Sequence, residues 1–352
     1  MGRGLRRVRR IALILLVGAP LLLLAGDVLL WRLAEQRLQQ GFAAWQQARR
    51  EEGWTLRNGL PAAGGWPGAA TLTLPDVVLT GGEADLPGGI SWQAGQVTLT
   101  VALLHPRVLR VQAAGRQALR LGALPAVQYM AGSTQAAVPL QPGAAAAPPA
   151  IEMQAVQVGV PAVGPGTARV ARLRADFIPP ASGAGGFGFT LRAEAIALPA
   201  TQRWPLGPNV DSLDLTGSLQ GRVPQTASGL RARAAAWRDD GGMVVLRRIG
   251  LVWGKLEVSA SARLTLDATL QPMGAARARV TDYAAALDAM VAAHRIGAHM
   301  ATAIKAVLGL MAAAPSGGGP GEVEVPLTLQ DRVVSMGRIP LARVPELVWP
   351  QS

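Results

Sequence analysis

Cysteine is absent from this chain of 352 residues, and its absence excludes several kinds of functional site. Without cysteine the protein has no disulfide framework, no thiolate metal site, no cysteine nucleophile and no acylated cysteine of the lipoprotein kind. Lysine occurs only at Lys255 and Lys305, so arginine carries nearly all of the positive charge. The net charge of +12 comes with no zinc finger and no interleaving of aromatic and basic residues. We therefore expect solvated sheet faces and no binding of nucleic acid.

Histidine is also scarce, which limits the chemistry that the chain can support. The three histidines are His105, His294 and His299, and none has a partner at the four-residue spacing that places two metal ligands on one helical face. The sequence contains no Walker loop, no G-x-S-x-G elbow and no dinucleotide fingerprint. We therefore predict that the protein is not an enzyme and has no catalytic residue, no metal site and no cofactor.

The longest apolar run covers residues 11–31 and is interrupted only by Asp27. As a helix this run would extend over about 31 Å, which is close to the thickness of a bilayer core. A cleaved signal peptide is the alternative, but its apolar region usually has only about 7–15 residues. Arginines precede the run and none lies within it, which favours a cytoplasmic amino terminus. We expect residues 1–31 to be an uncleaved anchor in the inner membrane, with the body in the periplasm.

Residues 32–53 have the pattern of an amphipathic helix. Trp31, Leu38, Phe42 and Trp45 follow one another at spacings of seven, four and three, which makes one helical stripe. Gly53 is placed to end the helix. We expect a stalk that lies on the membrane surface or packs on the body of the protein.

From Trp54 onward the chain is dominated by short alternations of apolar and polar residues, which are typical of strands with one buried face. The stretch 132–150 is rich in alanine and proline, and it predicts a linker or a surface loop. We therefore expect a first β-rich half at 54–131 and a second at 151–352. Two alanine-rich segments within 282–313 predict an αα-hairpin that covers part of the sheet.

The longest alternation runs from Lys255 to Leu270, where every even-numbered residue is apolar and every odd-numbered one is polar. An unbroken strand of this length would span roughly 50 Å. Its apolar face must be buried either against a second sheet, as in a sandwich, or against an apolar ligand in an open, curved sheet. The candidate lining of such a groove comes from this strip and from the strand near residue 99: Leu256, Val258, Leu264, Leu266, Leu270, Val97, Leu99 and Val101.

Several tryptophan, glycine and proline positions occur in an order that resembles an envelope family, domain of unknown function 2125. They include Gly53-Trp54, Gly65-Trp66-Pro67, Ser91-Trp92, Gly115-x-Gln117, Trp253-Gly254 and Pro272-x-Gly274. The sequence departs from the family where Ser259-Ala260-Ser261 lacks an expected glycine and where Arg332 follows Asp331 in place of glycine. The family implies no established activity. It is distantly similar to AsmA-like proteins, whose inner-membrane anchor and curved β-groove are implicated in lipid handling and outer-membrane assembly.

These observations predict a mainly β protein with a small helical cap. A single transmembrane helix would precede an elongated, curved antiparallel sheet in two halves, either an open groove or a sandwich. We expect it to bind or transfer a phospholipid or another apolar ligand during envelope maintenance. The alternative is an assembly or scaffold protein with a closed sandwich and no ligand. Expected partners are the membrane, a lipid and another envelope protein.

Overall fold

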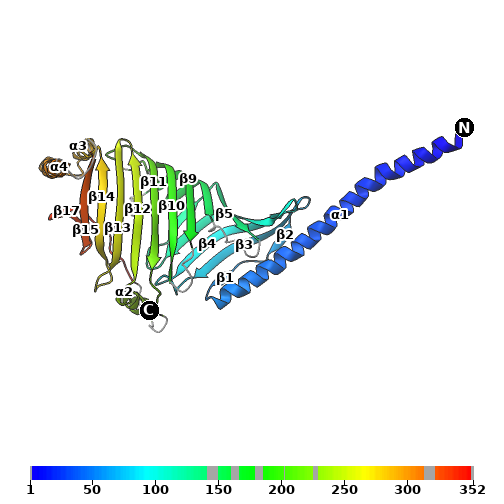
Figure 1. Ribbon diagram of the computed structural model, residues 1–352, viewed down its shortest axis with the longest axis horizontal. Coiled ribbons are helices and arrows are strands. Elements are labelled where there is room, and N and C mark those ends of the chain that lie inside the picture. Colours follow the sequence, from blue (N-terminus) through cyan, green and yellow to red (C-terminus); the bar gives the residue numbers. More distant parts are fainter. Residues whose placement is uncertain are drawn as a thin grey trace.

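A computed structural model describes residues 2–140, 150–159, 166–178, 185–201, 203–224, 229–312 and 322–349. Side chains are described from Gly26 onward, except at residues 310–312. The chain forms one long helix followed by a curved sheet of 17 strands with short helices at its margins (Figure 1). The prediction of a mainly β fold with an antiparallel sheet is confirmed.

The long helix α1 extends without interruption from Gly2 to Glu51. In Figure 1 its amino-terminal part projects away from the sheet, and its carboxyl-terminal part lies against the first strands. Among the residues with described side chains, no helix is long and apolar enough to cross a membrane. Most of the expected anchor, residues 1–31, lies outside those residues, so the anchor stays a prediction.

The strands follow one another in a continuous meander. Strands β1 to β8 are Thr55–Arg57, Ala62–Gly64, Ala69–Gly81, Ile90–Ala102, His105–Leu121, Val127–Met130, Ser133–Pro139 and Ala150–Gly159. Strands β9 to β17 are Thr167–Ile178, Gly186–Ala197, Asn209–Gln220, Met243–Trp253, Leu256–Leu266, Pro272–Thr281, Glu322–Gln330, Val333–Met336 and Ile339–Arg343. Both β1 and β2 pair with one edge of β3, and β6 and β7 lie end to end between β5 and β8. Every described pairing is antiparallel between near neighbours in sequence.

The register of these pairings places apolar residues on one face of the whole sheet. One row of cross-strand neighbours contains apolar side chains on twelve strands, from β3 to β15 without β6: Leu72, Leu99, Val111, Ala136, Ile151, Ala175, Leu191, Leu215, Ile249, Ala260, Ala278 and Val325. The opposite face carries exposed ion pairs such as Arg174 with Glu152 and Arg192 with Asp214. Exposed pairs of this kind contribute little to stability, so the fold depends on how the apolar face is covered.

Helices cover that apolar face only in part. Under α1, Leu72 and Leu74 on β3 are 3% and 2% exposed. Helices α3 (Tyr283–Ala292) and α4 (Ala298–Ala312) occupy the span in which an αα-hairpin was expected, and Ile304 packs there on Val323 of β15. Between these two covers, apolar residues such as Leu191 remain only half-buried. The middle of the sheet therefore presents an accessible apolar surface.

One end of the curved sheet is closed by helix α2 (Leu230–Asp239) and by segments that are distant in sequence. The loop between β3 and β4 reaches across to later strands, since the Val223 amide donates to the Ala84 carbonyl at 2.9 Å and the Gly186 amide donates to an Asp85 carboxylate oxygen at 3.2 Å. Figure 1 places α2 and the carboxyl terminus together at this margin. The sheet thus curls until the loop between β3 and β4 meets the start of β10 and the segment after β11.

The expected sixteen-residue strand ends sooner than its pattern indicates. Strand β13 stops at Leu266, because the Asp267 carboxylate accepts hydrogen bonds from the backbone amides of Thr269 and Gln271, at 2.8 and 2.9 Å, and forms a turn. Leu270 then has a positive φ of 64° and is buried against Trp349. The alternation beyond Leu266 belongs to a turn, so the prediction of an unbroken strand was wrong.

The expected linker at 132–150 also contains a strand. Ser133–Pro139 form β7, which pairs with β5 on one side and β8 on the other. The Gln117 side-chain amide donates to the Thr134 hydroxyl at 3.2 Å, and both side chains are buried. Pairing with both β5 and β8 makes this segment a strand, although its alanine-rich composition predicted a loop. Residues 141–149 of the expected linker lie outside the described residues.

Candidate apolar ligand site

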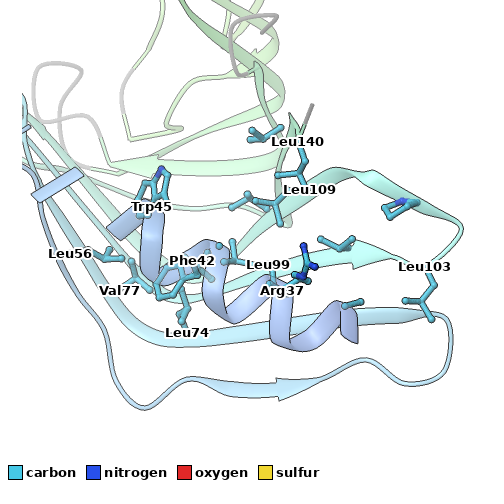
Figure 2. A pocket seen from close by; sticks show the side chains of 18 of the residues that line it. Arg37, Phe42, Trp45, Leu56, Leu74, Val77, Leu99, Leu103, Leu109 and Leu140 are labelled. Atoms are coloured by element: carbon cyan, nitrogen blue, oxygen red, sulfur yellow. The ribbon is translucent and has the colours of Figure 1, made fainter. Parts of the chain in front are cut away.

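A cavity of about 840 Å³ lies between α1 and the apolar face of the first strands. Its volume falls within the range of roughly 300–1,000 Å³ that is common for small-molecule pockets. Figure 2 shows the side chains of α1 and of the sheet converging on this space. Its lining is apolar almost throughout and includes Leu30, Leu33, Leu38, Phe42, Trp45, Leu74, Val77, Trp92, Val97, Leu99, Val101, Leu109, Val111, Val138 and Leu140.

The cavity exists because α1 packs against one margin of the curved sheet. The helix contacts β3 and β1, and the Trp31 indole N–H donates to the Gly64 carbonyl of β2 at 3.3 Å. Strands β4, β5 and β7 form the facing wall together with Leu140, which follows β7, and Leu109 and Leu140 project from this wall in Figure 2. Because the helix is docked along one side of the concave sheet, apolar space remains between the helix and the facing wall.

The two ends of the cavity differ in exposure. Around Leu74 and Val77 the wall is buried, at 2% and 3% exposure. At the other end, where α1 leaves the sheet, Leu30, Leu33 and Leu140 are 60%, 53% and 48% exposed. The cavity therefore has a buried floor around Leu74 and Val77 and an apolar mouth beside the emerging helix.

Polar groups are few at this site. Arg37 is the one charged residue among the described residues that line the cavity, and its side chain is exposed. The Trp92 indole N–H donates to the Tyr129 hydroxyl oxygen at 3.0 Å. Burial raises the pKa of Tyr129 because it disfavours the charged phenolate, and the hydrogen bond from Trp92 opposes this rise only in part. Tyr129 therefore remains neutral at physiological pH.

The structure separates the residues that the sequence suggested as one groove. Val97, Leu99 and Val101 line the cavity. The strip residues Leu256, Val258, Leu264 and Leu266 lie on the same apolar face but on β13, where they are half-buried outside the cavity. Leu270 belongs to neither, because it is buried in the turn beside Trp349.

The stripe of Leu38, Phe42 and Trp45 forms the roof of the cavity. The sequence predicted a stalk that lies on the membrane surface or packs on the body, and the structure shows the helix packed on β3. The cavity beneath the helix was not predicted. The signal was present in the stripe itself, because the apolar stripe of a surface helix typically packs against the core of the protein. The partner strand was also visible, since Leu109 and Val111 alternate with polar residues.

The side chains that line the cavity indicate which chemical groups it could accommodate. The described residues contain no group of three or more histidine, cysteine, aspartate or glutamate side chains that could hold a metal ion. An apolar cavity with one cation at its margin complements a ligand that has an apolar body and an anionic or polar end.

Comparisons with known proteins give one match. Residues 31–345 match the model of a family described as an uncharacterized protein conserved in bacteria, DUF2125. No curated protein and no solved structure matches the chain. The match begins at Trp31, so it includes the part of α1 that covers the cavity as well as the sheet.

Proposed function

We propose that this chain, which belongs to the DUF2125 family of bacterial proteins, binds the acyl chain of a membrane lipid in the cavity beneath α1. The observation that carries the proposal is the cavity of about 840 Å³ with its nearly continuous apolar lining. Binding there is non-enzymatic, and its role is to hold or transfer lipid in the bacterial envelope.

Exposed apolar surface supports this proposal. Transfer of apolar surface from water is favourable by about 25 cal/mol per Å², so an acyl chain gains free energy by lying against the lining. Contiguous apolar surface on a soluble domain commonly marks an interaction site or a ligand groove. The exposed side chains of Leu30 and Leu33 at the mouth extend that surface to the outside.

The position of the mouth supports a lipid as the ligand. Leu30 lies within the apolar run that we expect to span the inner membrane, and the mouth opens beside it. With the anchor in the membrane, the cavity opens close to the periplasmic surface of the bilayer. A lipid could then enter without its acyl chain crossing a long aqueous path.

The apolar face beyond the cavity supports transfer rather than storage alone. The row from Leu99 continues across half-buried residues such as Leu191 and Ile249 toward β15. The alternative of a scaffold with a closed sandwich needs this face to be covered, and its half-buried residues do not favour that. The AsmA-like resemblance agrees with an open curved sheet, but this is a fold-level analogy.

Photo-crosslinking tests the proposal on the full-length chain in its membrane. A photoreactive residue at Leu109, whose side chain lines the cavity, should form adducts with lipid. The same residue at Arg110, on the opposite face of β5, is the matched control and should form few. Mass spectrometry of the adducts would identify the lipid. Equal adducts at both positions, or none at either, would show that the cavity does not hold lipid.

A further inference from the structure

We infer that the lipid carries a phosphate in its head group and that Arg37 binds this phosphate. This inference rests on the proposed acyl-chain site and adds the chemical class of its ligand. Arg37 is the single charged side chain in the described lining, and no described residue in that lining is acidic.

The geometry places this charge where a head group would lie. Figure 2 shows the Arg37 side chain projecting from α1 toward the wall that Leu109 and Leu140 form. Its guanidinium is therefore at the accessible side of the cavity, with apolar side chains deeper inside. A lipid with its acyl chain along the lining would bring its polar end to this margin.

Arg37 is also free to take an external anion. Within the part of the chain that the structure describes, it forms no hydrogen bond or ion pair with a side chain. The nearest carboxylate in sequence, Glu35, lies two residues away on a different helical face and accepts a hydrogen bond from the Gln39 amide at 3.2 Å. The positive charge beside the cavity is thus left for a ligand.

The guanidinium is well matched to a phosphate diester. It is planar, remains charged at any physiological pH and presents two parallel N–H donors to two phosphate oxygens. A lipid with the same acyl chains and no phosphate would bury the same apolar surface without this pair of bonds. Arg37 should therefore contribute head-group selectivity and leave acyl-chain binding unchanged.

The test compares phosphatidylglycerol with diacylglycerol of identical acyl chains, added to the full-length chain in mild detergent and followed by native mass spectrometry. The variants are Arg37→Gln, Arg37→Lys and, as a matched control on the outer face of β5, Arg110→Gln. We expect the wild-type chain to prefer phosphatidylglycerol, and Arg37→Gln to reduce its affinity about tenfold, the effect of losing hydrogen bonds to a charged group. Arg37→Lys should fall between the two, and diacylglycerol should bind all variants equally.

The outcomes separate the two proposals. If wild type and Arg37→Gln bind both lipids equally, the acyl-chain site stands and the head-group assignment is overturned. If Arg110→Gln loses as much affinity as Arg37→Gln, general surface charge explains the preference and Arg37 has no specific role. If neither lipid binds the folded wild-type chain, the acyl-chain site itself fails. Competition by inorganic phosphate alone would identify a free-phosphate site and overturn the lipid assignment.

Discussion

Two residues at the turn between β15 and β16 adopt backbone conformations that normally favour glycine. Asp331 and Arg332 have φ values of 50° and 64°. The family resemblance implies glycine at the second position, and a left-handed conformation costs an L-residue roughly 1–2 kcal/mol. Arg332 offsets this strain because its guanidinium donates to the Val344 carbonyl at 3.3 Å and pairs with Glu346 at 2.9 Å. The arginine therefore connects the turn to the carboxyl-terminal segment.

This reading predicts different results for two substitutions at Arg332. Arg332→Ala loses both contacts and keeps the strained backbone, whereas Arg332→Gly loses the same contacts and relieves the strain. We expect the glycine variant to be more stable than the alanine variant by about 1 kcal/mol. Urea unfolding of the two variants measures the difference. Equal stability would show that the turn is not strained.

Asp267 has a pKa that makes the turn after β13 sensitive to acid. Burial raises this pKa, but hydrogen bonds from Gln271 and Thr269, together with the nearby charge of Arg238, outweigh the burial and lower it overall. The ionised carboxylate is therefore favoured in the folded state. Its stabilising contribution is complete above the unfolded pKa of about 3.9 and is lost as the pH falls through the lower folded value.

The lowered pKa of Asp267 predicts how Asp267→Asn changes stability. The substitution should lower stability at neutral pH by about 1 kcal/mol through weaker acceptance of backbone hydrogen bonds. As the pH falls from about 3.9 through the lower folded pKa, the difference between wild type and variant should shrink, because protonation removes the advantage of the wild-type carboxylate. Thermal unfolding across this pH range measures the effect. A difference that grows toward low pH would contradict the lowered pKa.

At the scale of elements, strands could be predicted where apolar and polar residues alternate and the same segment pairs with neighbouring strands. The alternation through Val97, Leu99 and Val101 gave the face of β4 correctly, because each of these residues is buried against its neighbours on β3 and β5. The pattern failed at Asp267, where a local side-chain turn competes with the strand. It also failed at β7, where cross-strand partners rather than composition decide the conformation.

The docking of α1 can be tested at two leucines that line the same cavity. Leu38 is 9% exposed and belongs to the core with β3, so Leu38→Ala should lower the unfolding free energy by about 2–3 kcal/mol. Leu33 is 53% exposed at the mouth, so Leu33→Ala should cost less than about 1 kcal/mol. Chemical denaturation followed by tryptophan fluorescence compares the two. Similar losses would mean that α1 does not pack on β3 through Leu38.

At the scale of the whole molecule, the existence of an apolar face was predictable and the location of the cavity was not. Alternation predicted that Leu264 and Leu99 each lie on the apolar face of their strand. The register shows that these are one and the same face of the sheet. Which part of that face has a cover depends on where α1 docks. That position is fixed by contacts between residues far apart in sequence, such as Trp31 with Gly64. Periodicity within one segment carries no information about such contacts.

The same face gives a test of whether the sheet is open, because a charge has different costs at covered and uncovered positions. Leu72 is 3% exposed beneath α1, and Leu72→Glu would leave an unpaired carboxylate in the core at a cost of several kcal/mol. That cost is comparable with the whole stability of a domain, so this variant should not fold. Leu264 is only half-buried, so the carboxylate of Leu264→Glu should stay hydrated and the variant should fold. Circular dichroism and thermal unfolding distinguish the two. Loss of folding in both variants would mean that the middle of the sheet is closed in solution, which would remove the transfer path along the apolar face while leaving the cavity beneath α1.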